Sequence, residues 1–301
     1  KPLKTNSGAG NPGLIGAIML VRAFLAACGD DRVQSTSTPE SGGELQVVAT
    51  TALLADMVKN VGRELVEVRS LVPPGADVHS FQSTPEDSIA INRAQVVVLN
   101  GFGLDDFLAP VLDSAGKENS TQVVAARGLT QGEDDPHFWQ NPAFAISYVE
   151  RIRDGLVAAD PGHESQYDAN AQDYIGLLRE LDLELNRILG QVEPELRHLI
   201  TYHDAFGHLA ERYGWEASAF VASDADEVSP QAVVEVLERL DRQGIPAIFM
   251  GPQFGSDVVR RAAEDSGIAV GILYSGVGEN EATSYINMMR LNAQTVTEHL
   301  R

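Results

Sequence analysis

The feature that most constrains the fold of this chain of 301 residues is a long helical stretch at residues 164–193, which contains no proline. About 30 residues at 1.5 Å each make a helix of roughly 45 Å, which is longer than one small domain is wide. Its apolar side chains recur at steps of three and four residues, the spacing of one helix face. They are Tyr174, Leu177, Leu178, Leu181, Leu185, Ile188 and Leu189. The stretch is either a long surface helix or a rigid helix that connects two lobes.

Short apolar runs and helical segments alternate on both sides of this stretch. The predicted strands are 44–50, 66–71, 95–99, 121–125, 198–202, 217–221, 247–250 and 269–274. The predicted helices are 51–61, 85–94, 143–160, 204–213, 229–243, 256–266 and 283–300. Such alternation is typical of parallel sheets covered by helices. The pattern therefore predicts an α/β fold with two lobes, at residues 44–163 and 194–301.

The charge balance excludes some partners. The chain has 22 Lys and Arg against 43 Asp and Glu, a formal net charge of −21. Nucleic acids and anionic membrane surfaces are bound through basic patches, so neither is expected as a partner. The single cysteine allows no intramolecular disulfide and no cysteine-based zinc site. Any metal must therefore be held by His, Asp and Glu.

The N-terminal segment has the pattern of an export signal. Lys1 and Lys4 precede an apolar run that ends in Leu25-Ala26-Ala27-Cys28. A basic start, a short apolar stretch and small residues before a cleavage site are typical of a secretory signal. The segment resembles a bacterial lipobox, in which the cysteine is lipidated. We therefore expect a signal peptide at 1–28 and a flexible tether at 29–43; the alternative is an incidental cysteine in an ordinary helix.

Three of the seven histidines stand at strand ends or turns. They are His79 after a Pro-Pro-Gly loop, His137 in DPHFWQNP, and His203 directly after the 198–202 strand. In open α/β sheets, ligands bind outside the carboxyl ends of the strands. Three imidazoles meeting there would suit a borderline metal such as zinc. The long spacing between them leaves open that they are scattered polar or core histidines.

Longer motifs resemble one family in order along residues 45–300. They include VVATTALLADMVKNVG, LVPPGADVHSFQSTPEDSIAINRAQVVVLNGFGLDDFL, DPHFWQNP, TYHDAFGHLAERYG and LYSG. They are similar to the zinc/manganese-binding solute-binding proteins of bacterial ABC importers. The resemblance implies two Rossmann-like lobes joined by one long rigid helix, with the metal in the interlobe cleft. It also implies a membrane permease as partner, an extracytoplasmic location and, in many members, a lipid anchor.

Position by position, His79, His137 and His203 match the first three metal ligands of the resembled family. Manganese-type members place a carboxylate where His203 stands, and imidazole at that position favours zinc. Gly276 stands where the family commonly has Asp as the fourth ligand. Three alternatives remain for that position. They are a water or chloride, Glu279 or Glu281 of the same loop, and a carboxylate of the Asp224–Glu227 segment.

Other polar residues near these motifs have weaker implications. Asn141 and Gly251 depart from the family pattern at positions that can support a ligating histidine. The acids of Gly132–Asp135 are expected to form a solvated turn, with metal gathering as the alternative. His163, His198, His208 and His299 are not expected to bind metal.

The leading hypothesis is an extracytoplasmic zinc receptor that delivers Zn²⁺ to an ABC permease and catalyses no reaction. A manganese receptor of the same family is the first alternative. A three-histidine zinc hydrolase is the second, because zinc with an open position can activate water. The motifs of a hydrolase are missing. A role in cell adhesion stays open, and we expect a monomer.

Overall fold

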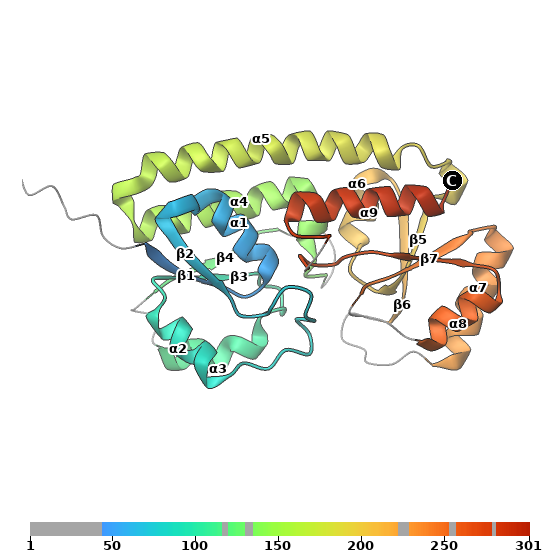
Figure 1. Ribbon diagram of the computed structural model, residues 1–301, viewed down its shortest axis with the longest axis horizontal. Helices are drawn as coiled ribbons and strands as arrows, with labels where there is room; N and C mark the ends of the chain where they lie inside the picture. The colour runs from blue at the N-terminus through green and yellow to red at the C-terminus, as the bar shows by residue number, and fades with distance from the viewer. Residues whose placement is uncertain (1–43, 116–119, 130–134, 222–228, 253–256, 279–280) are drawn as a thin grey trace, which may run out of the picture. The chain divides into compact units, whose positions relative to one another are not determined.

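The computed structural model describes residues 44–115, 120–129, 135–221, 229–252, 257–278 and 281–301. Two parallel sheets of four strands are present, with the orders β2-β1-β3-β4 and β6-β5-β7-β8 (Figure 1). The first contains β1 (Leu45–Ala49), β2 (Val66–Ser70), β3 (Val96–Leu99) and β4 (Thr121–Val124). The second contains β5 (His198–His203), β6 (Glu216–Val221), β7 (Ala247–Met250) and β8 (Ala269–Ile272). The predicted α/β class with parallel sheets is therefore confirmed.

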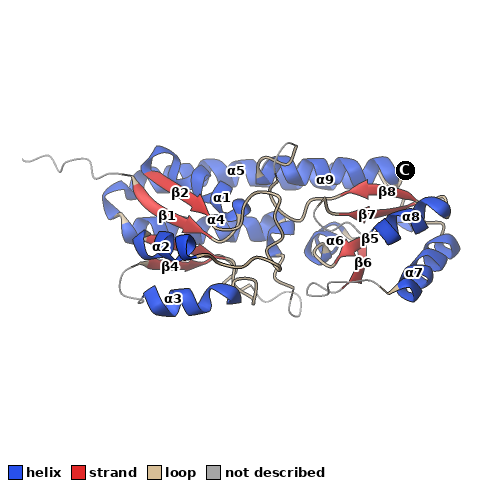
Figure 2. Ribbon diagram, turned by 60° about the horizontal axis from the view of Figure 1, so that its bottom comes forward, coloured by secondary structure: helices blue, strands red, loops and turns tan. Residues whose placement is uncertain are grey.

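Helices flank both sheets (Figure 2). They are α1 (Ala52–Gly62), α2 (Pro85–Arg93), α3 (Ala109–Ala115), α4 (Pro142–Ala159), α5 (Glu164–Leu189), α6 (Gly207–Tyr213), α7 (Pro230–Gln243), α8 (Asp257–Asp265) and α9 (Tyr285–His299). Short helix α3 was not predicted from the sequence. Helix α6 begins three residues later than predicted, because Ala205 turns back and donates its N–H to the carbonyl of His203.

Local sequence explains where several helices begin. The Thr51 hydroxyl caps α1 by accepting from the Leu54 N–H, and Ser284 caps α9 in the same way. Thr84 and Asp87 form a reciprocal capping box at the start of α2. The Asn141 side chain accepts from the Ala143 N–H at the start of α4. Such side chains satisfy backbone donors that have no partner inside the helix.

The central strands carry the core of each lobe. All four residues of β3 are buried, as are all four of β7. A strand with both faces buried needs apolar side chains at every position, which explains the unbroken runs VVVL and AIFM. Parallel pairing directs the carboxyl ends of neighbouring strands to the same edge, where the loops that bear histidines begin.

The long helix α5 has 26 residues, Glu164–Leu189. The predicted stretch reached residue 193, but the helix ends at the Gly190 cap, followed four residues later by Pro194. Its buried face includes Tyr167, Ala171, Tyr174, Ile175, Leu178, Leu181, Leu185 and Ile188. Leu177 was expected on this stripe, yet its side chain is 49% exposed. It lies at the edge of the buried face, next to the fully buried Leu178.

Helix α5 is attached to both lobes (Figure 1). On the first lobe, Asn170 Nδ2 donates to the carbonyl of Val61 at 2.9 Å. On the second, Asp182 accepts from Arg212 Nε at 3.0 Å and from the Tyr213 hydroxyl at 2.9 Å. Exposed ion pairs contribute little individually, so the apolar face supplies most of the attachment. Helix α5 thus joins the lobes as expected of a connecting helix.

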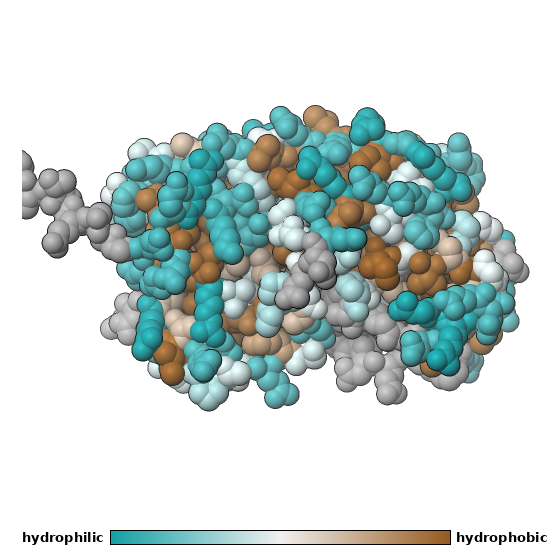
Figure 3. Space-filling model, in the orientation of Figure 1, coloured by the Kyte–Doolittle hydropathy of each residue, from teal (hydrophilic) through white to brown (hydrophobic). Residues whose placement is uncertain are grey.

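Hydrophilic side chains predominate on the face shown in Figure 3, with apolar ones scattered among them. Across the described residues, every helix is too short or too polar to cross a lipid bilayer. The predicted signal peptide with Cys28 and the tether at 29–43 lie outside the described residues.

Two glycines inside helices give opposite predictions for the same substitution. A Cβ at Gly155 in α4 would lie 2.1 Å from Val123 Cγ2, whereas one at Gly176 in α5 would meet no atom within 4 Å. Gly155→Ala should therefore lower the melting temperature, because a buried β-branched neighbour cannot move away easily. Gly176→Ala should raise it by about 2–4 °C, because alanine favours the helix by about 1 kcal/mol. Scanning calorimetry of both variants checks this, and shifts of the same sign would contradict it.

Candidate metal centre

His79 stands in the long loop between β2 and α2. Its backbone N–H donates to Asp77 Oδ1 at 2.9 Å, and Ser80 Oγ donates to the Asp77 carbonyl at 3.4 Å. These bonds make a local turn that directs the imidazole toward the second lobe. The Gly75 N–H donates across the lobes to the carbonyl of Val277 at 3.2 Å. The His79 side chain is exposed, so it forms the outer rim of the site.

His137 lies just before the 3₁₀ turn Phe138–Gln140 and is 2% exposed. Asp135 Oδ1 accepts from the His137 backbone N–H at 2.9 Å and from ring Nδ1 at 2.7 Å. A proton fixed on Nδ1 leaves Nε2 with its lone pair toward the site. Burial alone raises the pKa of Asp135, but the hydrogen bond and the attraction of His137 outweigh it, so this pKa is lowered. Asp135 therefore stays ionised and sets the tautomer of His137.

His203 is the last residue of β5 and is 5% exposed. The sequence placed it just after the strand, and the structure extends the strand by one residue to include it. Burial, followed by the neighbouring His137 and His79 rings, lowers the pKa of His203 to about 3. The ring is neutral at physiological pH, the form in which imidazole binds a metal.

The three rings meet although their positions in the sequence lie 58 and 66 residues apart. One nitrogen from each lies within 4.8 Å of the others, and His203 Nε2 lies 3.4 Å from His137 Nε2. The ring centroids are 5.1–5.7 Å apart. Within the described ranges, this is the group of His, Cys, Asp and Glu side chains close enough to hold a metal ion.

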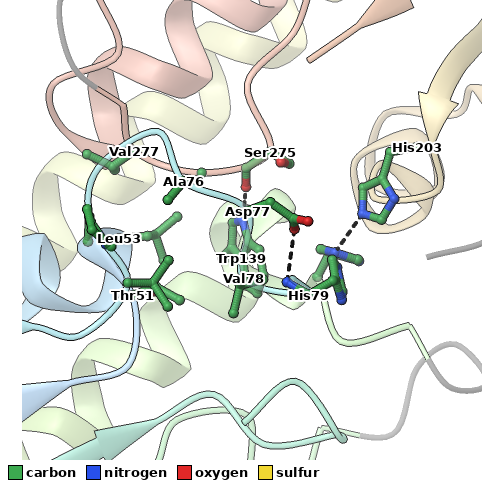
Figure 4. A pocket seen from close by; sticks show the side chains of 15 residues that line it. Thr51, Leu53, Ala76, Asp77, Val78, His79, Trp139, His203, Ser275 and Val277 are labelled. Atoms are coloured by element: carbon green, nitrogen blue, oxygen red, sulfur yellow. Dashed lines mark hydrogen bonds between the residues drawn. The ribbon is translucent and has the colours of Figure 1, made fainter. Parts of the chain in front are cut away.

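The three histidines line one end of a cavity of about 50 Å³ (Figure 4). The 275–277 segment after β8 forms another wall, together with the first turn of α1. Trp139 Nε1 donates to the Ser275 carbonyl at 2.7 Å, and Gln140 Nε2 donates to the same oxygen at 3.3 Å. These bonds join the two lobes next to the histidines and fix the position of Gly276.

The sequence left several candidates for a fourth metal ligand, some among the described residues and some outside them. Gly276 lines the cavity and offers no side chain. Glu281 is exposed, its carbonyl accepts from Asn287 Nδ2, and its carboxylate is not part of the histidine group. Glu279 and the Asp224–Glu227 segment lie outside the described residues.

Two residues beside the site make contacts that the sequence did not predict. Asp135 was expected in a solvated turn, and it instead orients His137. His208 stacks on Phe138 with ring centroids 4.4 Å apart, and its Nε2 lies 3.2 Å from the Asp135 carbonyl. The one signal for Asp135 was its place two residues before a candidate ligand, since a short acidic side chain there can bond the ring.

The remaining polar candidates have structural roles. Asn141 caps α4. His163 Nδ1 lies 2.6 Å from Asp160, His198 Nδ1 lies 3.2 Å from Glu216, and His299 Nδ1 lies 2.8 Å from the Thr295 carbonyl. None of these three histidines belongs to the group of side chains close enough to hold a metal ion.

Comparison with known proteins gives a consistent family. Residues 47–299 match the family described as ZnuA, zinc-uptake complex component A, periplasmic. The manganese-binding lipoprotein MntA of Halalkalibacterium halodurans is 29% identical over 297 residues, 94% of this chain and 96% of the relative. The iron-binding protein YfeA of Yersinia pestis is 27% identical over 294 residues, 94% of each chain.

Solved structures agree with this family and with the two-lobed fold. The periplasmic zinc binding protein TroA of Treponema pallidum superposes with a TM-score of 0.79 at 26% identity. That match covers 86% of this chain and 99% of TroA. The chain therefore belongs to the ZnuA family of metal-binding solute-binding proteins of ABC transporters, which are not enzymes.

Proposed function

We propose that this protein is an extracytoplasmic receptor that captures Zn²⁺ as its cargo through His79, His137 and His203. It would deliver the ion to the membrane permease of an ABC importer. The observation that carries the proposal is the convergence of three imidazole nitrogens within 4.8 Å, contributed by three remote segments of a ZnuA-family chain.

The geometry of the cluster fits tetrahedral zinc. Zinc binds imidazole nitrogen at about 2.0–2.1 Å, so two ligands of a tetrahedron lie roughly 3.3–3.4 Å apart. The nitrogens of His137 and His203 are 3.4 Å apart. These two ligands therefore need almost no rearrangement, whereas the exposed His79 can adjust its position from the rim.

The donor set supports zinc over manganese. Imidazole nitrogen suits zinc, whereas carboxylate and carbonyl oxygens suit manganese. The group close enough to hold an ion, as far as the chain is described, consists of three imidazoles with no carboxylate. Asp135 bonds the His137 ring and is not a member of the group that could hold an ion.

The N-terminal sequence supports a proposal about export and anchoring. The run ending in Ala26-Ala27-Cys28 precedes the polar segment 29–43. We propose that Cys28 is lipidated and that this segment tethers the receptor to a membrane. The name of the relative MntA, a manganese-binding lipoprotein, supports this proposal.

A manganese receptor is the second candidate. It is favoured by the names of relatives that cover nearly the whole chain, of which MntA is described as manganese-binding. The hydrolase alternative falls, because the family consists of binding proteins.

Alanine substitutions test the ligand assignment. His79→Ala, His137→Ala and His203→Ala should each weaken Zn²⁺ binding by at least about 100-fold, since loss of a supporting residue alone typically costs 10–100-fold. His198→Ala is the matched control, because His198 lies at the opposite end of β5 from His203. Isothermal titration with Zn²⁺ measures all four, and unchanged affinity in the three site variants would contradict the assignment.

Metal competition can overturn the zinc proposal, although a site with given donors generally binds Zn²⁺ more tightly than Mn²⁺, so that only retention of manganese decides between the two candidates. Metal-free protein should take up Zn²⁺ from an equimolar mixture of Zn²⁺ and Mn²⁺, since its three donors are imidazoles. Elemental analysis of the protein after desalting gives the ratio. Retention of manganese in preference to zinc would support the second candidate instead.

The buried imidazole of His203 should make the metal-free protein sensitive to acid. Its pKa is about 3 in the folded state and 6.5 in the unfolded state, so between these values the unfolded chain binds more protons. The contribution of His203 to the free energy of unfolding is therefore fully present above pH 6.5. It falls as the pH drops toward 3, by at most ~1.4 kcal/mol per pH unit.

Urea unfolding of the metal-free chain between pH 4.5 and 7 measures this dependence. His203→Gln should show a smaller slope of unfolding free energy against pH. Equal slopes of unfolding free energy against pH in the two proteins would show that the His203 ring is not held neutral by burial.

A further inference from the structure

Asn100 follows β3 directly and is only 1% exposed, although its side chain is polar. Its Nδ2 donates to the carbonyl of Pro136 at 3.0 Å and to that of Gly101 at 3.1 Å. Its Oδ1 accepts from the Tyr148 hydroxyl at 2.6 Å. Building on the zinc receptor proposed above, we propose that Asn100 is a positioning residue for metal binding. It acts through the Pro136–His137 peptide and determines where the His137 ring presents Nε2.

The peptide group between Pro136 and His137 is held on both sides. The carbonyl of Pro136 and the N–H of His137 belong to one planar unit. Asn100 donates to the carbonyl, whereas Asp135 Oδ1 accepts from the N–H at 2.9 Å and from ring Nδ1 at 2.7 Å. A rotation of this plane would break the bond from Asn100 and would move the N–H away from Asp135. Asn100 therefore fixes the backbone on which the bond between Asp135 and the imidazole depends.

The surroundings of Asn100 match the donors and the acceptor of an amide side chain. An amide has two N–H donors and one oxygen acceptor on a short stem. The two carbonyls use both donors, and the oxygen accepts from Tyr148, which is completely buried. Burial raises the pKa of Tyr148 well above its usual value, so the hydroxyl keeps the proton that it donates. Loss of the amide would leave the buried Pro136 carbonyl without this donor, and buried polar groups that lose a partner are costly.

The segment that follows Asn100 also contacts the residue on the other side of His137. Phe102 has a φ of +54°, in the left-handed region that is sterically disfavoured for a residue with a Cβ. Its ring lies edge-on to Phe138, with the ring centroids 4.7 Å apart. Disfavoured backbone conformations of this kind persist only where the surrounding structure holds them, and they cluster at ligand sites. The segment that begins with Asn100 thus contacts both chain neighbours of His137.

Substitution of Asn100 tests the proposal through zinc affinity. Asn100→Asp keeps the size of the side chain and an acceptor for Tyr148, but it removes both amide donors. We expect it to weaken Zn²⁺ binding by at least about 10-fold in isothermal titration, the lower end of the loss for a residue that supports a metal ligand. Asn100→Ser introduces no charge and should weaken binding in the same direction.

Tyr148→Phe is the matched control, because it removes one buried bond of the same group and leaves both donors of Asn100 in place. It should lower the melting temperature, since Asn100 Oδ1 loses its donor. It should change the Zn²⁺ affinity much less than the Asn100 variants do. A loss of affinity that merely follows the loss of stability would be equally large in Tyr148→Phe and in Asn100→Asp.

The nitrogen NMR shifts of the His137 ring provide a readout that a purely structural role of Asn100 would not change. In the metal-free wild-type chain, the ring should carry its proton on Nδ1, where Asp135 accepts it. In folded Asn100→Asp or Asn100→Ser, the two tautomers should be mixed, because the peptide plane is released. Tyr148→Phe should keep the single tautomer of the wild-type chain.

Four results would overturn the inference. They are unchanged Zn²⁺ affinity in the Asn100 variants, a single His137 tautomer in those variants, equal affinity losses in Tyr148→Phe and Asn100→Asp, and mixed tautomers already in the metal-free wild-type chain. The last of these needs no variant to fold. In all four cases the receptor proposal stands if the wild-type chain binds Zn²⁺. Failure of the wild-type chain to bind Zn²⁺ would overturn the receptor proposal and this inference with it.

Discussion

The hydrogen bond from Trp139 Nε1 to the Ser275 carbonyl, 2.7 Å long, is the contact on which the site depends most directly. His79 and His137 belong to the first lobe and His203 to the second, so their rings meet only if the lobes are held in register. Tyr285 extends the same junction, donating its hydroxyl to the Trp139 carbonyl and its N–H to Asp56. Helix α5 packs on both lobes and limits their relative motion. A junction of buried and partly buried directional bonds beside a long helix favours a preorganised site over one assembled by large domain closure.

The electrostatics of the cluster prepare it for a cation. Burial keeps His203 neutral, and the ionised Asp135 fixes the tautomer of His137. His208 belongs to the second lobe and packs beside Asp135. Asp135, which orients the His137 ring in the first lobe, is therefore also in contact with the second lobe. If His137 binds the metal as proposed, the site and the contact between the lobes share the residues around Asp135.

Much of the fold follows from periodicity alone. Runs such as VVVL at 96–99 and AIFM at 247–250 are typical of buried strands at this length and between helical segments, and they are β3 and β7. Side-chain contacts were harder to predict. Leu177 fits the three- and four-residue spacing of the apolar stripe of α5, but its side chain faces solvent. The spacing allows either of two neighbouring positions, 177 or 178, to lie on the buried face, and Leu178 is the buried one. The sequence predicts a solvated turn at Asp135, because its place two residues before His137 shows only that a bond to the ring is possible, and tertiary packing decides whether that bond forms. The histidine cluster itself was only one alternative from spacing, and the family resemblance made it specific.

The central claim is that three imidazoles from His79, His137 and His203 bind one zinc ion. X-ray absorption at the zinc edge of the loaded protein tests it most directly, because the spectrum reports ligand type, number and distance. We predict three imidazole nitrogens at about 2.0–2.1 Å and one further light-atom ligand. A shell with one imidazole or none, or one composed mainly of oxygen, would contradict it.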